Sequence, residues 1–238
     1  MNTIQDFHNL CTKNNITLSN QQITQFQRYY ELLIEWNEKM NLTAITDFHE
    51  VCLKHFYDSI ALVHYLEFKE SDFVLDIGTG AGFPGIPLKI LFPNTRFVLA
   101  DSLNKRLIFL DEVIQKLELE KIELVHGRAE DLGHDSDFRE QFDYCLSRAV
   151  ANLSTLSELC LPFVKVGGQF ISYKSEHVKD EINQADHALA VLNGKIDRQE
   201  DYTLPDSDFF RSILFIRKED GCPNQYPRKA GKPNKNPL

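Results

Sequence analysis

A run of glycines next to a carboxylate is the segment of this chain best suited to hold a small ligand. It reads Asp76-Ile77-Gly78-Thr79-Gly80-Ala81-Gly82-Phe83-Pro84-Gly85 and closes a short apolar stretch that is typical of a buried strand. Glycines in this position allow a tight turn and let the backbone approach a bound molecule closely. We therefore expect a ligand site at this loop.

The glycine spacing fits two cofactor patterns. Gly80, Gly82 and Gly85 satisfy the dinucleotide pattern GxGxxG. Gly78, Gly80 and Gly82, preceded by Asp76, satisfy the DxGxGxG pattern of S-adenosylmethionine (SAM) methyltransferases. Asp76 would repel a pyrophosphate, but it can hold the cationic amino end of SAM directly or through water. Because the chain also shows no separate substrate domain of a dehydrogenase, the loop favours SAM as the cofactor.

Three more polar positions follow predicted strands. Asp101 ends the second strand, where a carboxylate can accept hydrogen bonds from ribose hydroxyls, although it would suit NAD equally well. After the third strand, the backbone around Ala129 can bind an adenine, and Glu130 can accept a hydrogen bond from the adenine amino group. Alternatively, Glu130 or Asp131 only caps the next helix. After the fourth strand, Arg148 can line the cofactor pocket and bind an anionic substrate, or form an ion pair with Glu130 or Asp131.

The elements that must position these residues follow two patterns. Up to residue 70 the chain reads as helical: Ser19 and Gln22 resemble a capping box, and a second helix is expected from Phe48 to about Tyr65. After residue 70, strands alternate with helices. The expected strands are Phe73–Ile77, Arg96–Ala100, Ile122–His126, Phe142–Ser147, Gln169–Tyr173, Lys195–Tyr202 and Ser212–Arg217. The expected helices are Pro84–Leu91, Lys105–Leu117, Ser154–Leu161 and Val178–Leu192.

This alternation predicts an α/β fold with a doubly wound, mainly parallel seven-stranded sheet, the Rossmann-like class I fold of SAM-dependent methyltransferases. The last two strands, with little helix between them, are expected as an antiparallel pair at one edge. We expect two domains: an N-terminal helical extension over 1–70, and a SAM-binding domain over 71–238 that ends in a basic tail.

Composition narrows the class of protein. The 238 residues are 42 % hydrophobic, which supports a sizeable core, and no long apolar run predicts a membrane span. The five cysteines are odd in number and form no CxxC pair, so we expect reduced thiols in a cytoplasmic protein and no metal site. The net charge of −9 argues against a chain coated in nucleic acid, yet residues 217–238 are basic.

Seven segments, in order along nearly the whole chain, resemble the small-subunit ribosomal RNA methyltransferase G family, historically called glucose-inhibited division protein B. They are Asn41–Ile45, Lys54-His55 with Asp58-Ser59, Asp76–Gly85, Asp101–Arg106, Gly127–Asp131, Ser147–Ala151 and Arg228–Gly231. The resemblance implies N7 methylation of a guanine in 16S ribosomal RNA. It places the cofactor contacts at Gly78, Phe83, Ala129, Glu130 and Arg148. The implied partner is 16S ribosomal RNA or the small ribosomal subunit, and we expect a monomer.

No catalytic side chain is predicted. Guanine N7 carries an accessible lone pair, so its methylation needs no prior deprotonation, and alignment and desolvation would supply most of the rate enhancement. The residues alone leave the roles of Lys54, His55 and Asp58 open. Lys54 and Asp58 lie four residues apart on one helix, a spacing that fits an ordinary surface pair, and His55 is expected as a packed helix residue. Other acceptors, or a SAM-binding module without catalysis, remain open on the residues alone.

The basic tail is the last predicted contact surface. Arg228 and Lys229 are expected to bind RNA phosphates beside Arg148, after a turn of the chain near Gly221 and Pro223. The alternative is a solvated terminus.

Overall fold

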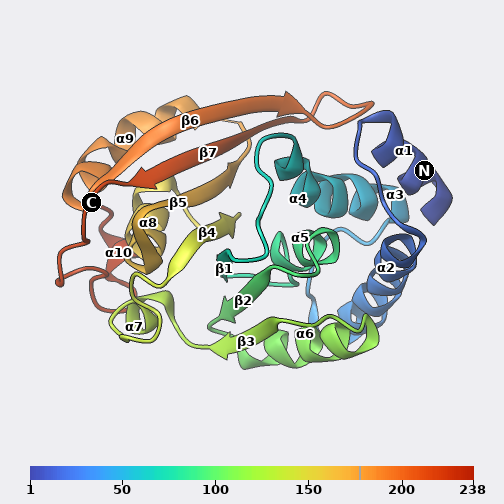
Figure 1. Ribbon diagram of the computed structural model, residues 1–238, viewed down its shortest axis with the longest axis horizontal. Coiled ribbons are helices and arrows are strands. Elements are labelled where there is room, and N and C mark those ends of the chain that lie inside the picture. The colour runs from blue at the N-terminus through green and yellow to red at the C-terminus, as the bar shows by residue number, and fades with distance from the viewer. Residues whose placement is uncertain (177) are drawn as a thin grey trace.

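The computed structural model describes residues 1–176 and 178–238. Its centre is a seven-stranded sheet with the strand order β3-β2-β1-β4-β5-β7-β6, which runs from bottom to top in Figure 1. The strands are β1 Phe73–Ile77, β2 Arg96–Asp101, β3 Ile122–His126, β4 Phe142–Arg148, β5 Val164–Lys174, β6 Gly194–Thr203 and β7 Phe210–Lys218. All seven predicted strands are present; β5 is longer than predicted at its start.

The pairing of the strands brings the predicted polar positions to one edge. β3, β2, β1, β4 and β5 are parallel, while β7 is antiparallel to both β5 and β6. The predicted mainly parallel sheet with an antiparallel edge pair is therefore confirmed. Register pairs Asp101 with His126 and Arg148 with Tyr173, so the carboxyl ends of these strands lie together. In such sheets, ligands bind at this edge.

Helices cover both faces of the sheet, as Figure 1 shows. One face carries α5 Gly85–Leu91 and α6 Asn104–Lys116. The other carries α8 Leu153–Cys160 and α9 Val178–Val191, with the short helices α7 Ala129–Leu132 and α10 Lys232–Lys235 beside α8. Pro84 is the N-cap of α5 rather than a residue of its first turn.

The N-terminal region is helical, as predicted. α2 spans Asn20–Met40, and Ser19 and Gln22 form the expected capping box. Helical structure then continues from Phe48 to His64 as α3 Phe48–Val51, a π-helical segment Cys52–Tyr57, α4 Asp58–Ile60 and a 3₁₀ turn Ala61–His64. A further helix, α1 Ile4–Lys13, was not predicted, although Thr3 and Asp6 form a second capping box at its start.

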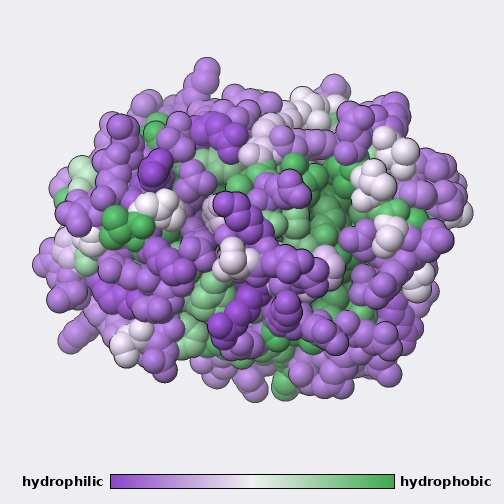
Figure 2. Space-filling model, viewed as in Figure 1, coloured by the Kyte–Doolittle hydropathy of each residue, from purple (hydrophilic) through white to green (hydrophobic). Residues whose placement is uncertain are grey.

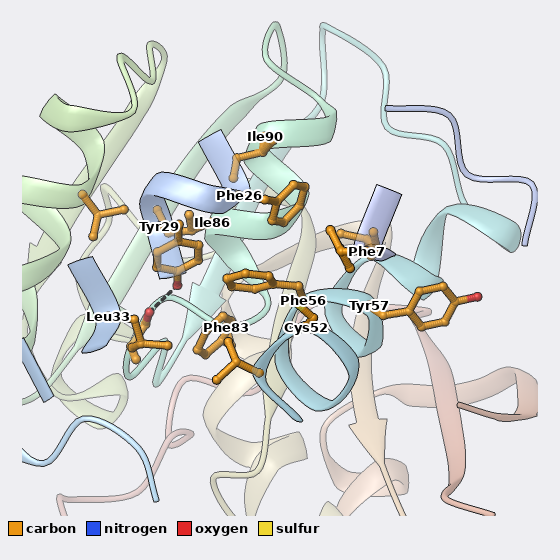
Figure 3. Packing of buried hydrophobic residues seen from close by; sticks show 14 of the residues in the cluster. Phe7, Phe26, Tyr29, Leu33, Cys52, Phe56, Tyr57, Phe83, Ile86 and Ile90 are labelled. Carbon is orange, nitrogen blue, oxygen red and sulfur yellow. Dashed lines mark hydrogen bonds between the residues drawn. The ribbon is translucent and has the colours of Figure 1, made fainter. Parts of the chain in front are cut away.

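The N-terminal helices share a core with the α5 and α6 face. Phe26 and Phe56 have ring centroids 5.1 Å apart, and Phe56 also packs near Phe83 of the glycine loop, as Figure 3 shows. The buried Tyr29 hydroxyl donates a hydrogen bond to the Ala81 carbonyl. The extension therefore packs directly against the backbone of the predicted ligand loop.

The outer surface and the thiols agree with the compositional expectation. Hydrophilic residues cover most of the face seen in Figure 2. All five cysteines are buried and carry free thiols. Among the described residues, no helix is long and apolar enough to cross a membrane.

Candidate functional site

The glycine loop leaves β1 with backbone that other residues rarely adopt. Gly78 and Gly80 have φ values of +69° and +62°. A Cβ built on Gly78 would lie 2.7 Å from Val150 Cγ2, whereas one on Gly80 has only the Gly78 carbonyl oxygen nearby, at 3.9 Å, and would project into open space. Glycine is therefore required here by conformation, and it keeps the hollow above the loop open.

Asp76 lies behind this loop and not on the wall of the hollow. Its Oδ2 accepts hydrogen bonds from the Thr79 hydroxyl at 2.7 Å and the Gly85 N–H at 3.0 Å. Burial raises the pKa of Asp76 to about 6, against the effect of these two bonds. The two bonds on Oδ2 hold the loop, whereas Oδ1 is buried and has no hydrogen-bond partner among the described residues. The predicted contact of Asp76 with the amino end of SAM, directly or through water, stays a prediction.

Asp101 lies where the sequence placed it, on the wall above the loop. Its Oδ2 accepts from the Gly80 N–H at 2.9 Å and pairs with Arg106 at 3.1 Å, while its Oδ1 accepts from the Leu103 N–H at 2.9 Å. A carboxylate so held is oriented before any ligand arrives. Arg106, whose side chain is 37 % exposed, ends one of the segments that resemble the family, but its pairing with Asp101 was not predicted.

Three adjoining cavities follow the carboxyl edge of the sheet. The central cavity, of about 450 Å³, lies over the loop and is lined by residues including Gly78, Gly80, Phe83, Asp101 and Arg148. The β2–β3 cavity, of about 150 Å³, shares Gly78 and Asp101 with it and adds Ala129 and Glu130. The β4–β5 cavity, of about 340 Å³, shares His55, Arg148 and Ala149 with the central one. The predicted cofactor residues other than Asp76 therefore line the central and β2–β3 cavities, which together are called the cofactor groove.

Arg148 is held by a carboxylate from the N-terminal region. Its guanidinium lies 3.3 Å from Asp58 Oδ2, and Asp58 Oδ1 pairs with Arg211 at 3.1 Å and accepts from the Tyr202 hydroxyl at 3.0 Å. Asp58 is only 5 % exposed. The expected surface pair of Lys54 and Asp58 is wrong, since Lys54 pairs with Glu50, and the alternative pairing of Arg148 with Glu130 or Asp131 is not formed.

His55 lines both the central and the β4–β5 cavities, and Phe83 beside it lines the central one. Their rings stack with centroids 4.6 Å apart, and the Arg148 guanidinium lies over Phe83 at 5.1 Å. Burial, with help from the nearby charges of Arg148 and Lys54, lowers the pKa of His55 to about 4. His55 is therefore neutral at neutral pH, and its place as a packed helix residue agrees with the sequence analysis.

The basic tail reaches the β2–β3 cavity and not the surroundings of Arg148. The Gly231 N–H donates to Glu130 Oε1 at 2.9 Å, and Asn234 lines the cavity beside Ala129. Glu130 is thus on the predicted wall, with one oxygen already engaged by the tail. Arg139 holds the preceding segment through the carbonyls of Cys222 and Tyr226.

The two predicted RNA contacts of the tail differ in their surroundings. The Arg228 guanidinium binds both oxygens of Glu158, which is fully buried, with contacts of 2.8 and 2.6 Å. This guanidinium is engaged inside the protein, so the structure does not support its expected role as a phosphate contact. Lys229 is exposed. The expected turn near Gly221 and Pro223 is present, but after it Arg228 pairs with the buried carboxylate of Glu158.

Several residues of the β4–β5 cavity were missed. The cavity is lined by Lys54, Arg148, Lys174 and Arg211 together with Asp58 and Glu181. Lys174 ends β5 at the same edge as Arg148, and the antiparallel pairing of β7 with β5 brings Arg211 there. For Lys174 and Arg211, a position next to the end of a predicted strand was the available sequence signal. The sequence carries no such signal for Glu181, which lies on α9.

The groove fits SAM on chemical grounds. A Cβ on Gly80 would fill the cradle above the loop, an oriented carboxylate at Asp101 suits ribose hydroxyls, and Arg148 offers a cation for a carboxylate. Ala129 and Glu130 at the far end suit an adenine. These residues would hold the cofactor in the groove, and Arg148 belongs to both this groove and the β4–β5 cavity.

Comparison with known proteins gives a consistent result. The family model of rRNA small subunit methyltransferase G matches residues 22–202. The chain is 53 % identical to ribosomal RNA small subunit methyltransferase G of Lachnoclostridium phytofermentans, over 93 % of this chain and 91 % of that one. It is 49 % identical to the protein of the same name from a Geobacillus species (strain WCH70), over all of both chains.

A solved structure supports the fold. A SAM-dependent O-methyltransferase from Thermotoga maritima superposes with a TM-score of 0.53, at 16 % sequence identity, over 79 % of this chain and 71 % of that one. At this identity the likeness concerns the fold alone, and it agrees with the predicted class I architecture.

Proposed function

Since the chain belongs to the rRNA small subunit methyltransferase G family, we propose that it transfers a methyl group from SAM to N7 of a guanine in 16S ribosomal RNA. It is a SAM-dependent ribosomal RNA methyltransferase with a class I fold. The choice of guanine N7, and of 16S ribosomal RNA as the molecule that carries it, is the part that remains to be tested.

The observation that carries the proposal is the charge of the β4–β5 cavity. This chain has a net charge of −9, yet the cavity next to the cofactor groove is lined by four cationic side chains and two carboxylates. Arg148 belongs to both cavities. A cationic hollow beside the methyl donor suits a nucleotide, because phosphate groups reward positive charge.

The proposed reaction needs no acid or base from the protein. When bound, SAM supplies a methyl group on a positively charged sulfonium. Guanine N7 needs no deprotonation, so a neutral His55 and the ion-paired Asp58 are no obstacle. The protein has to orient the base against the groove and to exclude water. Both effects lower the barrier to methyl transfer by aligning the reacting atoms before the reaction. No side chain is assigned as a catalytic base.

The test is transfer of labelled methyl groups to ribosomal particles. Tritiated SAM is incubated with the protein and small ribosomal subunits from a strain that lacks the modification, in parallel with protein-free 16S ribosomal RNA. We expect label on N7-methylguanosine after nuclease digestion of the RNA. Label found only on protein, on a small molecule or on another atom of the RNA would overturn the proposal. The two RNA arms decide between the assembled subunit and free RNA.

We also propose that the protein acts as a monomer in the cytoplasm, where ribosomal subunits assemble. Sedimentation of the protein with and without SAM tests this, and a stable dimer would contradict it.

A further inference from the structure

The β4–β5 cavity contains an ion pair that the proposed function has not used. Lys174 Nζ lies 2.6 Å from Glu181 Oε2, and both side chains line the cavity. The pair is anchored to the backbone: Lys174 also donates to the Ala151 carbonyl at 3.1 Å, and Glu181 Oε2 also accepts from the Leu153 N–H at 2.8 Å. The side chains are 6 % and 24 % exposed, so the pair is fixed and largely shielded from water.

Each member of the pair keeps an unused hydrogen-bonding position. An ammonium group has three donors, and two of those of Lys174 are engaged. Among the described residues, no side chain or backbone group donates to Glu181 Oε1. Acceptor and donor therefore stand side by side on the wall of the cavity.

We propose that Glu181 and Lys174 read the Watson–Crick edge of the guanine that is methylated. On that edge a carbonyl acceptor, O6, stands beside two donors, N1–H and the N2 amino group. Lys174 donates to O6, and Glu181 Oε1 accepts from N1–H and N2–H. Adenine presents the opposite polarity at the first two positions, so the same pair rejects it. This inference rests on the proposed function and names the residues that select its base.

The other carboxylate of the cavity cannot take this role. Both oxygens of Asp58 are engaged, by Arg148, Arg211 and the Tyr202 hydroxyl. Of the two carboxylates, Glu181 is therefore the one with an oxygen to which no described residue donates.

Reading this edge leaves the reacting atom free. Around the base, O6 lies between N7 and N1–H, so a base whose N1–H and N2 amino group meet Glu181 turns N7 away from it. Ala149 and Arg148 line both this cavity and the central one, and they mark the side toward which N7 would face. The N7 lone pair makes no hydrogen bond in this arrangement and stays available for methyl transfer.

The experiment compares guanosine with inosine, which lacks only the N2 amino group. Small-subunit RNA is ligated from two pieces so that the modified position carries either nucleoside, and single-turnover methylation is measured with wild-type protein, Glu181→Gln and Asp180→Asn. Asp180 is exposed on the same helix and serves as the matched control. The modified position is located first with unaltered RNA, and that step alone tests the proposed function.

We expect the wild-type protein and Asp180→Asn to favour guanosine over inosine by about tenfold or more. With inosine, the Glu181 carboxylate keeps the hydrogen bond from N1–H but loses the charged hydrogen bond from the N2 amino group. Glu181→Gln still offers an oxygen to Leu153 and Lys174, which turns its amide nitrogen toward the base. It should methylate both RNAs slowly and at nearly equal rates, with unchanged affinity for SAM.

Two outcomes would overturn the inference while leaving the proposed function intact. The first is a wild-type protein that methylates inosine and guanosine RNA equally well, a result that needs no variant to fold. The second is a Glu181→Gln protein that keeps the full wild-type preference for guanosine.

Discussion

The cofactor groove and the β4–β5 cavity adjoin but are built differently. Over the groove, the backbone at Gly78 and Gly80 shapes the space, with Asp101 held by the Gly80 N–H. In the β4–β5 cavity, charged side chains such as Arg148, Lys174 and Arg211 define the wall. A cofactor common to many enzymes is thus held by a short contiguous segment, whereas the surface offered to a particular acceptor is assembled from distant ones.

This difference predicts which property, stability or ligand binding, a substitution in each region reduces. Removing Asp58 from the β4–β5 cavity should disturb the fold, since Arg148 and Arg211 share this carboxylate, whereas changes along the groove should affect ligand binding more than stability. Four predictions test this contrast.

The largest effect is expected for Asp58→Ala. The substitution leaves Arg148 and Arg211, whose side chains are 11 % and 19 % exposed, without their shared carboxylate. Breaking a buried charge network in this way costs about 3–5 kcal/mol. Urea unfolding followed by circular dichroism measures the loss. Glu35→Ala, which breaks an exposed pair with Lys39, is the control and should cost at most about 1 kcal/mol. Equal losses in the two variants would contradict the contrast.

Asp101→Ala tests the groove. It removes a carboxylate that we expect to bind the ribose of SAM, worth roughly 1.5–3 kcal/mol for bonds to a charged group. The affinity for SAM, measured by calorimetry, should fall about 10-fold to 100-fold. Asp111→Ala, at an exposed position on α6, should bind SAM like the wild-type protein. A near-normal affinity of Asp101→Ala would count against the ribose contact.

Gly78→Val tests whether the backbone shapes the cradle. The new side chain would meet Val150 and would have to adopt a positive φ, so the loop should shift and the affinity for SAM should fall by about tenfold or more. Gly167→Val is the matched control, because Gly167 also has a positive φ, of +85°, but no atom lies within 4 Å of its Cβ position. If both variants weaken SAM binding equally, backbone strain and not the cradle explains the effect.

The same contrast explains what the sequence could predict. The loop Asp76–Gly85 is contiguous, and its closely spaced glycines indicate a tight backbone turn from the sequence alone. Strand periodicity predicted all seven strands and the edge pair. The wall of the β4–β5 cavity has no such local pattern, because Asp58 meets Arg148 and Arg211 only after the sheet and the N-terminal helices have packed.

Asp76 shows a different limit of sequence reasoning. Its pattern was recognised, but the sequence does not show on which side of the loop the carboxylate points. Thr79 and Gly85, three and nine residues further on, supply donors that bind it behind the loop. Asp76 therefore supports the loop through Oδ2, a role that its place in the binding motif did not predict.

The smallest expected effect separates the neighbours Arg228 and Lys229. Lys229 is exposed, and we propose it as a phosphate contact, so Lys229→Ala should lower the slope of log affinity for ribosomal RNA against log salt by about one unit. Filter binding over a range of salt concentrations measures this slope. SAM affinity and unfolding should remain as in the wild-type protein. Arg228→Ala should instead destabilise the fold, because it leaves the buried Glu158 unpaired. A double substitution would mix the two effects, so each variant must be measured alone. An unchanged slope in Lys229→Ala would mean that the tail only covers the β2–β3 cavity, through Gly231 and Glu130, and makes no contact with RNA at this lysine.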